Sequence, residues 1–282
     1  MPIIMGHLLQ TAGWLVFAVV AAVLWIRGIW EPRHPEYTET VLGDGGTTLR
    51  VLLLADLHAN LNRVPVERLI AAVAGCKPDL LLFAGDACSG RRDAGTSVLL
   101  LARLGAAARA EGIPAYAVPG NHDDVLDASA FDNAGIPWLR NRAAEILTAR
   151  GDRWTLVGLD DRKLGPPRFP AAGGLPAGVP AARTLILSHN PDNVYLPLPG
   201  SARFFLCGHF HGGQIWMPFH LEFRLLRREK LAAEGIYRGS FQRNGMFGYI
   251  SRGIGCVVFP LRLFSRPEIS VITLCEGNGD KI

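Results

Sequence analysis

The sequence predicts an α/β fold, a β-sandwich flanked by helices and preceded by an N-terminal transmembrane helix. Short apolar runs of strand length alternate with helical stretches in the middle of the chain, which is typical of α/β folds. A long uncharged stretch lies near the N-terminus. Of the 282 residues, 49% are hydrophobic and only 19% are charged, which excludes a disordered chain or a coiled coil.

Residues 1–30 are interpreted as a membrane anchor helix. The stretch from Leu8 to Ile26 has no charged residue, and at about 19 residues it is just long enough to cross a bilayer. Trp25 and Trp30 lie at its end, where interfacial aromatic residues often occur. The alternatives are a buried core helix, disfavoured by the polar stretch that follows, and a cleaved signal, disfavoured by the absence of Lys and Arg before Leu8.

The region after the apolar stretch predicts the orientation and the domain boundaries. Arg27 and Arg33 follow directly, and the positive-inside rule then places the body in the cytoplasm. We therefore expect a single-pass protein of the inner (cytoplasmic) membrane whose main domain faces the cytoplasm. Residues 31–48 are expected to be a linker that ends in the glycine-rich turn 43–46, and residues 49–282 are expected to form one domain.

Six runs in the body have the length and composition of strands: 49–55, 80–84, 115–118, 154–159, 184–187 and 204–207. Helical stretches at 64–74 and 98–110 separate the early runs, which predicts a largely parallel sheet covered by helices. Three further runs, at 246–251, 256–259 and 269–274, have only short connections between them. Short connections predict antiparallel pairing in this last part of the chain.

Polar residues follow five of the predicted strands. The blocks are Asp56-Leu57-His58, Gly85-Asp86, Gly120-Asn121-His122-Asp123, Ser188-His189 and Gly208-His209-Phe210-His211. Because the carboxyl ends of strands in such sheets meet at one crevice, these side chains are expected to lie together. A single histidine is more often an ordinary core or surface residue, but five of the eight histidines lie at these strand ends.

The expected cluster offers carboxylates, imidazoles and an amide, with no thiolate. This mixture suits first-row dications such as Mn, Fe or Zn and suits Ca poorly. The polar groups are too many for one tetrahedral zinc and about right for two neighbouring metals that share a water. The five scattered cysteines are interpreted as free thiols of a reducing compartment.

The order Asp-x-His, Gly-Asp, Gly-Asn-His-Asp, His and Gly-His-x-His, over residues 56–211, resembles the calcineurin-like metallophosphoesterases. Blocks at 208–214, 237–239, 251–255 and 266–269 resemble a membrane-anchored bacterial phosphodiesterase branch. That branch includes a pyrophosphatase that acts on UDP-2,3-diacylglucosamine in lipid A synthesis. The resemblance implies the metallophosphoesterase-type sandwich and a metal-dependent hydrolase of phosphodiester or pyrophosphate bonds.

The same resemblance implies roles for individual residues. Two divalent ions are expected, with Mn favoured over Fe or Zn. One would be held by Asp56, His58 and His211, the other by Asn121, His189 and His209, with Asp86 bridging both. A bridging hydroxide would attack phosphorus directly. His122 would face the substrate phosphate and act on the leaving oxygen, oriented by Asp123 or another carboxylate.

Three arginines are candidate substrate-binding residues. Arg224 and Arg227 lie in residues 215–230, where large apolar residues mix with basic ones. This segment is either an interfacial segment that admits a lipid substrate or an ordinary core-facing segment with a charged outer face. Arg252, in a glycine-rich turn, is expected to bind a second phosphate or to form a structural salt bridge.

The expected partner is a lipid-linked phosphate substrate such as UDP-2,3-diacylglucosamine. Two alternatives remain: the same chemistry on a soluble phosphodiester, nucleotide or phosphoprotein, and a non-catalytic binding protein that retains the fold. The net charge of +4 is too dispersed to indicate nucleic acid. The sequence does not indicate an oligomeric state.

Overall fold

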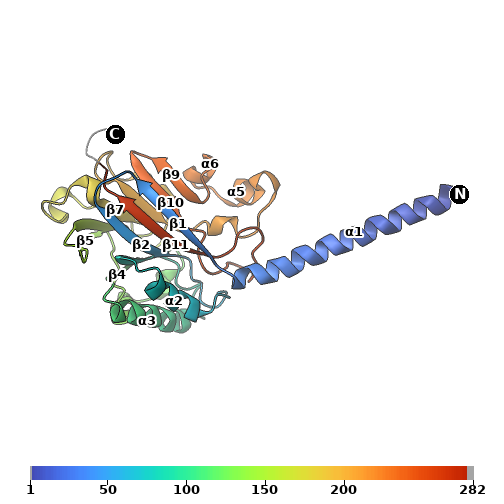
Figure 1. Cartoon of the computed structure of the whole chain (residues 1–282), viewed down its shortest axis with the longest axis horizontal. Coiled ribbons are helices and arrows are strands. Elements are labelled where there is room, and N and C mark those ends of the chain that lie inside the picture. Colours follow the sequence, from blue (N-terminus) through green and yellow to red (C-terminus); the bar gives the residue numbers. More distant parts are fainter. Residues whose placement is uncertain (1, 278–282) are drawn as a thin grey trace.

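The body of the protein contains two packed β-sheets with helices on their outer faces, as seen in a computed structural model that describes residues 2–277 (Figure 1). The first sheet has the order β1 (Glu36–Gly43), β11 (Glu268–Cys275), β2 (Thr48–Leu54), β3 (Leu80–Ala84), β4 (Ala115–Val118). The second has the order β5 (Arg142–Leu147), β6 (Arg153–Gly158), β7 (Thr184–Leu187), β8 (Phe204–Cys207), β10 (Met246–Ile250), β9 (Gly239–Arg243). This two-sheet α/β architecture confirms the predicted fold class.

Helices fill the connections between the strands. The α-helices are α1 (Pro2–Trp30), α2 (Val66–Gly75), α3 (Ala94–Ala110), α4 (Ala128–Ala134), α5 (Leu221–Leu226) and α6 (Lys230–Ala233). Short 3-10 helices are η1 (Glu31–Arg33), η2 (Asp123–Val125), η3 (Ala172–Gly174), η4 (Ala181–Arg183), η5 (Pro191–Tyr195), η6 (His211–Gly213) and η7 (Pro218–His220). Residue 1 and residues 278–282, at the ends of the expected ranges 1–30 and 49–282, lie outside the described residues.

Alternation along the strands divides the core into layers. On β2, Leu52 and Leu54 pack against α2 and α3, whereas Val51 and Leu53 point between the two sheets. A third apolar layer lies on the other face of the second sheet, where Phe205 packs with residues of α5 and α6. Burying both faces requires apolar residues at nearly every position, which explains why these strands read as continuous apolar runs.

Parallel pairing brings the functional strand ends together. In the first sheet, β2, β3 and β4 are mutually parallel, and in the second sheet β6, β7, β8 and β10 are parallel. The loops that carry the predicted polar blocks therefore leave from the same ends of neighbouring strands. The boundaries of β3, β4, β7 and β8 coincide with those predicted.

Three predictions for the chain outside these strands were wrong. The expected linker 31–48 contains η1 and strand β1, which pairs in parallel with β11. Residues 256–259 form bends rather than a strand. The two remaining C-terminal strands, β10 and β11, lie in different sheets and do not pair with each other. The antiparallel partner of β10 is β9, and that of β11 is β2.

Strands β5 and β9 were missed because few of their side chains are apolar and buried.

Helix α1 leaves the body at one end and is a candidate membrane span (Figure 1). By length and composition residues 10–33 could cross a bilayer, and almost none of this segment is buried against the body. Large side chains such as Trp14, Phe17 and Trp25 are therefore exposed along it. A core helix would bury such residues, so the exposure favours the anchor interpretation.

Candidate metal centre

The polar blocks of the two sheets meet where strands β2, β3, β4, β7 and β8 end. The backbone N–H of His209, after β8, donates to both carboxylate oxygens of Asp56, after β2, at 3.1 and 3.0 Å. Asp56 is fully buried, and His58, Asp86, His189 and His211 are buried as well. The convergence predicted from the strand ends is therefore present.

One group of potential ligands consists of Asp56, His58 and His211, whose ligand atoms lie within 4.8 Å of one another. The Nε2 atoms of His58 and His211 are 3.2 Å apart, and His211 Nε2 is 3.5 Å from Asp56 Oδ1. Two donors that are each about 2.1 Å from one ion lie roughly 3.0–3.4 Å apart. The observed separations therefore fit a shared cation.

A second group surrounds His189. Its Nε2 atom lies 3.4 Å from Asp86 Oδ2, 3.1 Å from Asn121 Oδ1 and 3.0 Å from His209 Nδ1. These distances again match donors that share one ion. The ligand atoms of Asp56, Asp86 and His189 also lie within 4.8 Å of one another, so Asp56 lies close to both groups.

Asp86 lies between the two groups. Its Oδ2 atom is 3.5 Å from His58 Nε2 in the first group and 3.4 Å from His189 Nε2 in the second. Its Oδ1 atom accepts the backbone N–H of His122 at 2.8 Å, which fixes the carboxylate plane. A single oxygen that faces both groups is the geometry expected of a bridging ligand.

The other ring nitrogens of the histidines have partners that leave the ligand nitrogens free to bind a cation. His189 Nδ1 lies 2.9 Å from the Ala84 carbonyl oxygen, and His58 Nδ1 lies 3.1 Å from Ser89 Oγ. His209 Nε2 lies 2.8 Å from Glu229 Oε1. Metal-binding histidines commonly donate their second ring N–H to an oxygen in this way. The residues present thus fit two divalent ions.

Burial lowers the pKa values of three candidate ligand histidines, which favours metal binding. Burial lowers the pKa of His58 to about 4 and also lowers the pKa of His209 and His211, which keeps these rings neutral. Burial raises the pKa of Asp56 to about 7. A neighbouring cation would lower this pKa again and favour the ionised carboxylate at neutral pH.

Asp86 and His189 form a charge pair within the cluster. Burial opposes ionisation of Asp86, but the imidazoles of His189 and His58 outweigh it and lower its pKa below the usual range. Burial likewise lowers the pKa of His189, but the Asp86 carboxylate outweighs this effect and raises it to about 10. Binding of a divalent ion by His189 therefore requires the ring to release a proton.

Five residues of the cluster hold left-handed backbone conformations. The φ angles are 52° at Asp56, 40° at His58, 55° at Asp86, 76° at His209 and 51° at His211. Such conformations cost non-glycine residues about 1–3 kcal/mol each and persist where the surroundings enforce them. Their concentration at this one place indicates that the loops are shaped for the position of the side chains rather than for stability.

Glycines leave room for the carboxylates. A Cβ atom at Gly208 would lie 2.6 Å from Asp56 Oδ2, and a Cβ atom at Gly120 would overlap Asp86 Oδ1. Any side chain at these positions would displace a candidate ligand. The glycines of the predicted blocks are therefore required by close approach and not only by the turns that contain them.

Asp123 has a different role from the one predicted. Its buried carboxylate accepts backbone N–H groups of Asp86 at 2.8 Å, Ala87 at 2.8 Å and Gly120 at 2.9 Å. These bonds use both oxygens and hold the loop after β3 against the loop after β4. These contacts are those of a residue that positions Asp86, rather than of a carboxylate that faces the His122 ring.

A pocket of about 330 Å³ opens beside the cluster. His122 and Arg227 line it together with the candidate ligands, and the apolar residues Val257 and Val258 form part of its wall. The His122 ring lies edge-on to the His58 ring, with 5.2 Å between the ring centroids. This arrangement places one further imidazole and one guanidinium where a phosphate could contact them.

The predicted arginines have different environments. Arg227 lies at the pocket, and its Nη2 donates to the His209 carbonyl oxygen at 3.0 Å. Arg224 is exposed on α5 and does not line the pocket. Arg252 pairs with Glu36 at 2.7 Å and with Glu268 at 3.3 Å. Because two carboxylates engage its guanidinium, the phosphate role expected of Arg252 is not supported, and the salt-bridge alternative describes it.

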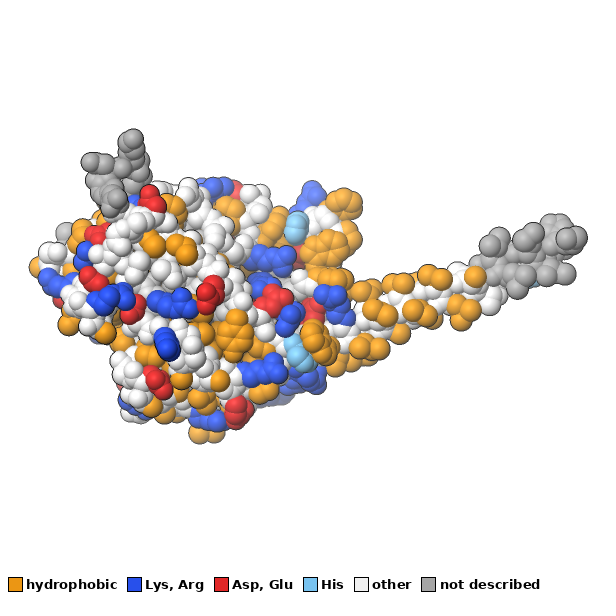
Figure 2. Space-filling model, viewed as in Figure 1, with side chains coloured by type: hydrophobic (Ala, Val, Ile, Leu, Met, Phe, Trp, Pro, Cys, Tyr) orange, Lys and Arg blue, Asp and Glu red, His pale blue; other side chains and the backbone are white. Residues whose placement is uncertain are grey.

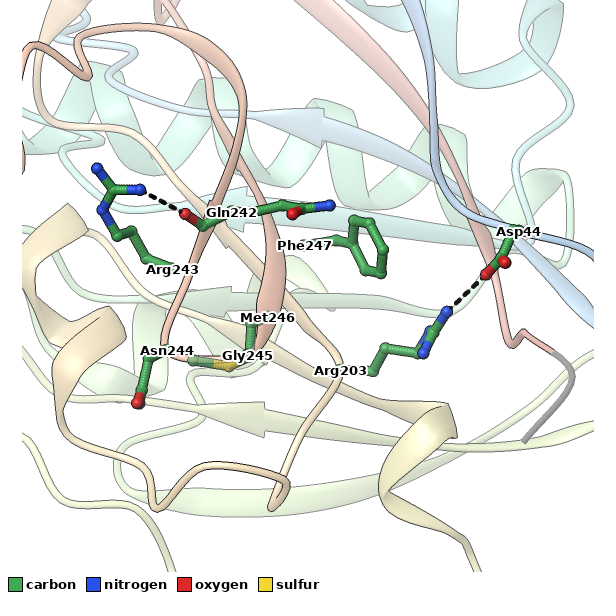
Figure 3. Close-up of a pocket in the computed structure, with 8 residues that line it drawn as sticks. All are labelled: Asp44, Arg203, Gln242, Arg243, Asn244, Gly245, Met246 and Phe247. Carbon is green, nitrogen blue, oxygen red and sulfur yellow. Dashed lines mark hydrogen bonds and ion pairs between the residues drawn. The ribbon is translucent and has the colours of Figure 1, made fainter. Parts of the chain in front are cut away.

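A larger hollow of about 510 Å³ lies elsewhere (Figure 3). It is formed by the β9–β10 turn, and by Arg203, which precedes β8 and pairs with Asp44 at 2.8 Å. This is the end of the second sheet opposite to the metal cluster, because the ligands follow the carboxyl end of β8. It contains no histidine and none of the predicted site residues.

Two residues near the cluster were not predicted. Glu229 follows His209 by twenty positions, and no sequence pattern links them, yet its carboxylate contacts the His209 ring. Arg262 is fully buried and donates to the carbonyl oxygens of His211 at 3.3 Å and Ser265 at 3.0 Å. Both residues fix ligand-bearing loops through contacts that only the folded chain creates.

Substitution of Glu229 by Gln is expected to weaken metal binding by about 10–100-fold, the usual loss when a partner of a metal-binding histidine is removed. The amide removes the negative charge that holds the His209 N–H. Metal content after dialysis against a weak chelator measures the effect. Glu234→Gln is the matched control, because Glu234 pairs with Arg243 away from the cluster. Equal metal retention in both variants would contradict the assignment.

Comparison with known proteins gives consistent similarities. Residues 49–213 match the model of a family described as calcineurin-like phosphoesterase. The chain is 32% identical over 243 residues to phosphodiesterase YaeI of Escherichia coli, covering 82% of this chain and 84% of that protein. It is 27% identical to metallophosphoesterase YkuE of Bacillus subtilis, covering 88% of each. A Danio rerio transmembrane protein with metallophosphoesterase domain is 26% identical, with 92% of this chain and 62% of that protein covered.

Proposed function

Since the chain belongs to the calcineurin-like phosphoesterase family, we propose that it hydrolyses a phosphodiester or pyrophosphate bond in a lipid-linked substrate of the inner membrane. Family membership confirms the resemblance inferred from the motif order and makes the protein a metal-dependent phosphoesterase. The observation that carries the proposal is the position of Asp86 Oδ2, which faces both ligand groups at the base of an open pocket.

Asp56, His58 and His211 would hold one ion, and Asn121, His189 and His209 would hold the other, with Asp86 near both. Two divalent ions, with manganese favoured, would lower the pKa of a bound water to about 7, so that its hydroxide could attack phosphorus directly. They would also supply positive charge for the phosphoryl oxygens. Asp56 and Asp86 offset only part of that charge, so the pocket attracts an anionic substrate.

His122 and Arg227 act on the substrate from the pocket wall. His122 lies beside the ligands and donates a hydrogen bond or proton to the leaving oxygen. Arg227 reaches the same pocket and binds a second phosphate, as a pyrophosphate substrate requires. Its contacts with the His209 carbonyl oxygen and with Glu229, at 3.5 Å, hold the guanidinium in place.

A lipid-linked substrate is supported by the anchor and by the apolar part of the pocket. Helix α1 is long and apolar enough to cross a membrane, and Val258 at the pocket wall is 76% exposed. Arg27 and Arg33, which follow the apolar stretch, support a body on the cytoplasmic side. UDP-2,3-diacylglucosamine, an intermediate of lipid A synthesis, has the diphosphate and the acyl chains that this arrangement would accept.

The test is hydrolysis by purified full-length protein in detergent, with manganese and with chelator. UDP-2,3-diacylglucosamine is compared with a soluble chromogenic diester. We expect metal-dependent cleavage of both and a higher kcat/KM for the lipid-linked diphosphate. A higher kcat/KM for the soluble diester would contradict the lipid-linked substrate, and absence of metal-dependent cleavage of either would contradict the mechanism.

A further inference from the structure

We propose that two apolar loops beside the metal pocket, residues 216–226 and 257–264, insert into the surface of the lipid leaflet next to α1. We name these two loops together the seating surface. Phe219, Leu225 and Leu226 in the first loop are 82%, 74% and 73% exposed, and Val258 and Phe259 in the second are 76% and 61% exposed. Contiguous apolar exposure of this kind marks interaction sites rather than ordinary protein surface.

The two loops form one surface although they are far apart in the sequence. The backbone N–H of Trp216 donates to the Leu263 carbonyl oxygen at 2.9 Å, and the rings of Trp216 and Phe264 pack edge to face with centroids 6.1 Å apart. Of the first loop, Phe223 is buried against Tyr237, which fixes α5 to the body. The segment 215–230 thus combines a buried side chain that attaches it to the body with an exposed apolar face.

Helix α1 is attached to this same surface. The backbone N–H of Arg262 donates to the Gly28 carbonyl oxygen at 3.1 Å, and the Arg27 guanidinium lies 4.3 Å from the centre of the Phe264 ring. Figure 2 shows hydrophobic and basic side chains gathered at the end of the body from which α1 leaves. A bilayer crossed by α1 would therefore lie against the seating surface, which is why the occupant is the membrane and not a second protein.

The charges beside the loops fit an anionic leaflet. Arg224 and Arg228 have exposed side chains in or next to the first loop, whereas the acidic Glu222 is 5% exposed and accepts the Met217 N–H at 3.1 Å. The exposed charge at this face is therefore positive. Basic residues next to inserted apolar side chains are the composition of proteins that bind anionic membranes.

The backbone of the loops supports an outward role for the apolar tips. Val258 and Phe219 have φ angles of 63° and 58°, which large and β-branched side chains rarely adopt. Because these side chains are exposed, their packing in the body does not offset the cost of the strained backbone. The conformations are explained if they present the side chains to the bilayer.

Gln214 connects the seating surface to the metal cluster. It follows the candidate ligand His211 by three residues, and its side chain accepts the Val257 N–H at 2.7 Å and donates to the carbonyl oxygens of Val257 and Phe259 at 3.0 and 3.1 Å. Because Val257 and Val258 also line the pocket, insertion of the loops would bring the pocket mouth to the lipid surface. Delivery of substrate along this surface rests on the proposed function, whereas insertion itself does not.

The first experiment measures insertion directly in full-length protein reconstituted into vesicles of phosphatidylethanolamine and phosphatidylglycerol. In a Cys76→Ser background, where the other cysteines are buried, single cysteines replace Phe219, Leu226 or Val258 and carry an environment-sensitive fluorophore. Leu198→Cys is the control, because Leu198 is 79% exposed and neighbours the β9–β10 turn, at the end of the body opposite to the cluster.

Labels on the seating surface are expected to be quenched by lipids with a nitroxide near the top of the acyl chain and to be protected from aqueous iodide. The Leu198→Cys label is expected to show the reverse. Iodide quenching of the loop labels as strong as that of the control would overturn the proposal. This result does not depend on catalysis, so an inactive protein with inserted loops would count against the proposed function alone.

The second experiment asks whether insertion serves substrate delivery. The triple variant Phe219→Asp, Leu225→Asp, Leu226→Asp is expected to lower hydrolysis of a vesicle-embedded lipid diphosphate by about tenfold or more, since charged groups resist insertion. Hydrolysis of a soluble diester is expected to stay unchanged. Leu198→Asp is the matched control. Unchanged hydrolysis of the embedded substrate, or an equal loss on both substrates, would contradict the delivery role.

Discussion

Asp86→Asn is expected to remove both metals and to abolish hydrolysis, with a loss greater than the 10–100-fold typical of residues that only support a ligand. Asp86 is 2% exposed, and its Oδ1 is fixed by the His122 N–H. An asparagine that keeps this bond must turn its NH2 group toward the Nε2 atoms of His58 and His189, where a ligand oxygen stood. The variant therefore loses a negative charge and places a donor against the ions.

Metal content by mass spectrometry, measured together with the hydrolysis rate, tests this prediction. Asp124→Asn is a suitable control, because Asp124 lies near the same loops but forms a half-exposed pair with Lys163 at 3.1 Å. Circular dichroism of both variants excludes global unfolding as the cause. An Asp86→Asn protein that is active without metal would overturn the two-metal scheme.

His122→Asn is expected to retain both metals and to lower kcat by about 10²–10⁴-fold, the usual contribution of a general acid. The substitution preserves the hydrogen bond from His122 to Asp86, because that bond uses the backbone N–H and not the ring. The ring itself lines the pocket, where it can reach the leaving oxygen. The variant thus separates proton donation from metal binding.

A series of diesters with leaving groups of different pKa provides the specific readout for His122. A good leaving group such as p-nitrophenolate needs little protonation, so its hydrolysis should fall less than that of an alkyl ester. Asn121→Ala is the contrasting variant, because it removes a candidate ligand that lies 3.1 Å from His189 and should lose metal. An equal loss for all leaving groups in His122→Asn would refute the general-acid role.

The strands that carry the site could be predicted because they are buried on both faces and are followed by polar residues. Candidate ligands such as Asp86 and His189 lie two residues after continuous apolar runs, and this contrast is visible in the sequence. Strand β1 lacks the contrast, because its side chains alternate between half-buried and exposed at the edge of the first sheet. Its polar, turn-rich neighbourhood resembles a linker.

The supporting residues could not be predicted because their partners are set by the tertiary structure. Glu229 reaches His209 only after α5 folds back on the second sheet, and Asp123 turns toward backbone N–H groups instead of the adjacent His122 ring. Arg252 meets Glu36 because β1 joins the sheet, an element that the sequence did not indicate. Local patterns identify ligands, whereas long-range packing determines what holds them.

Helix α1 continues through η1 into strand β1, so no flexible linker separates α1 from the body. The N–H of Glu36 donates to the Pro267 carbonyl oxygen at 2.8 Å, and Arg266 donates to the His34 carbonyl oxygen at 2.7 Å, so the junction is tied to the C-terminal strand. A body held this way could not swivel freely above a bilayer that α1 crossed. For a substrate in the same leaflet, encounter then becomes a two-dimensional search, governed by lateral diffusion and by mole fraction among the lipids rather than by bulk concentration.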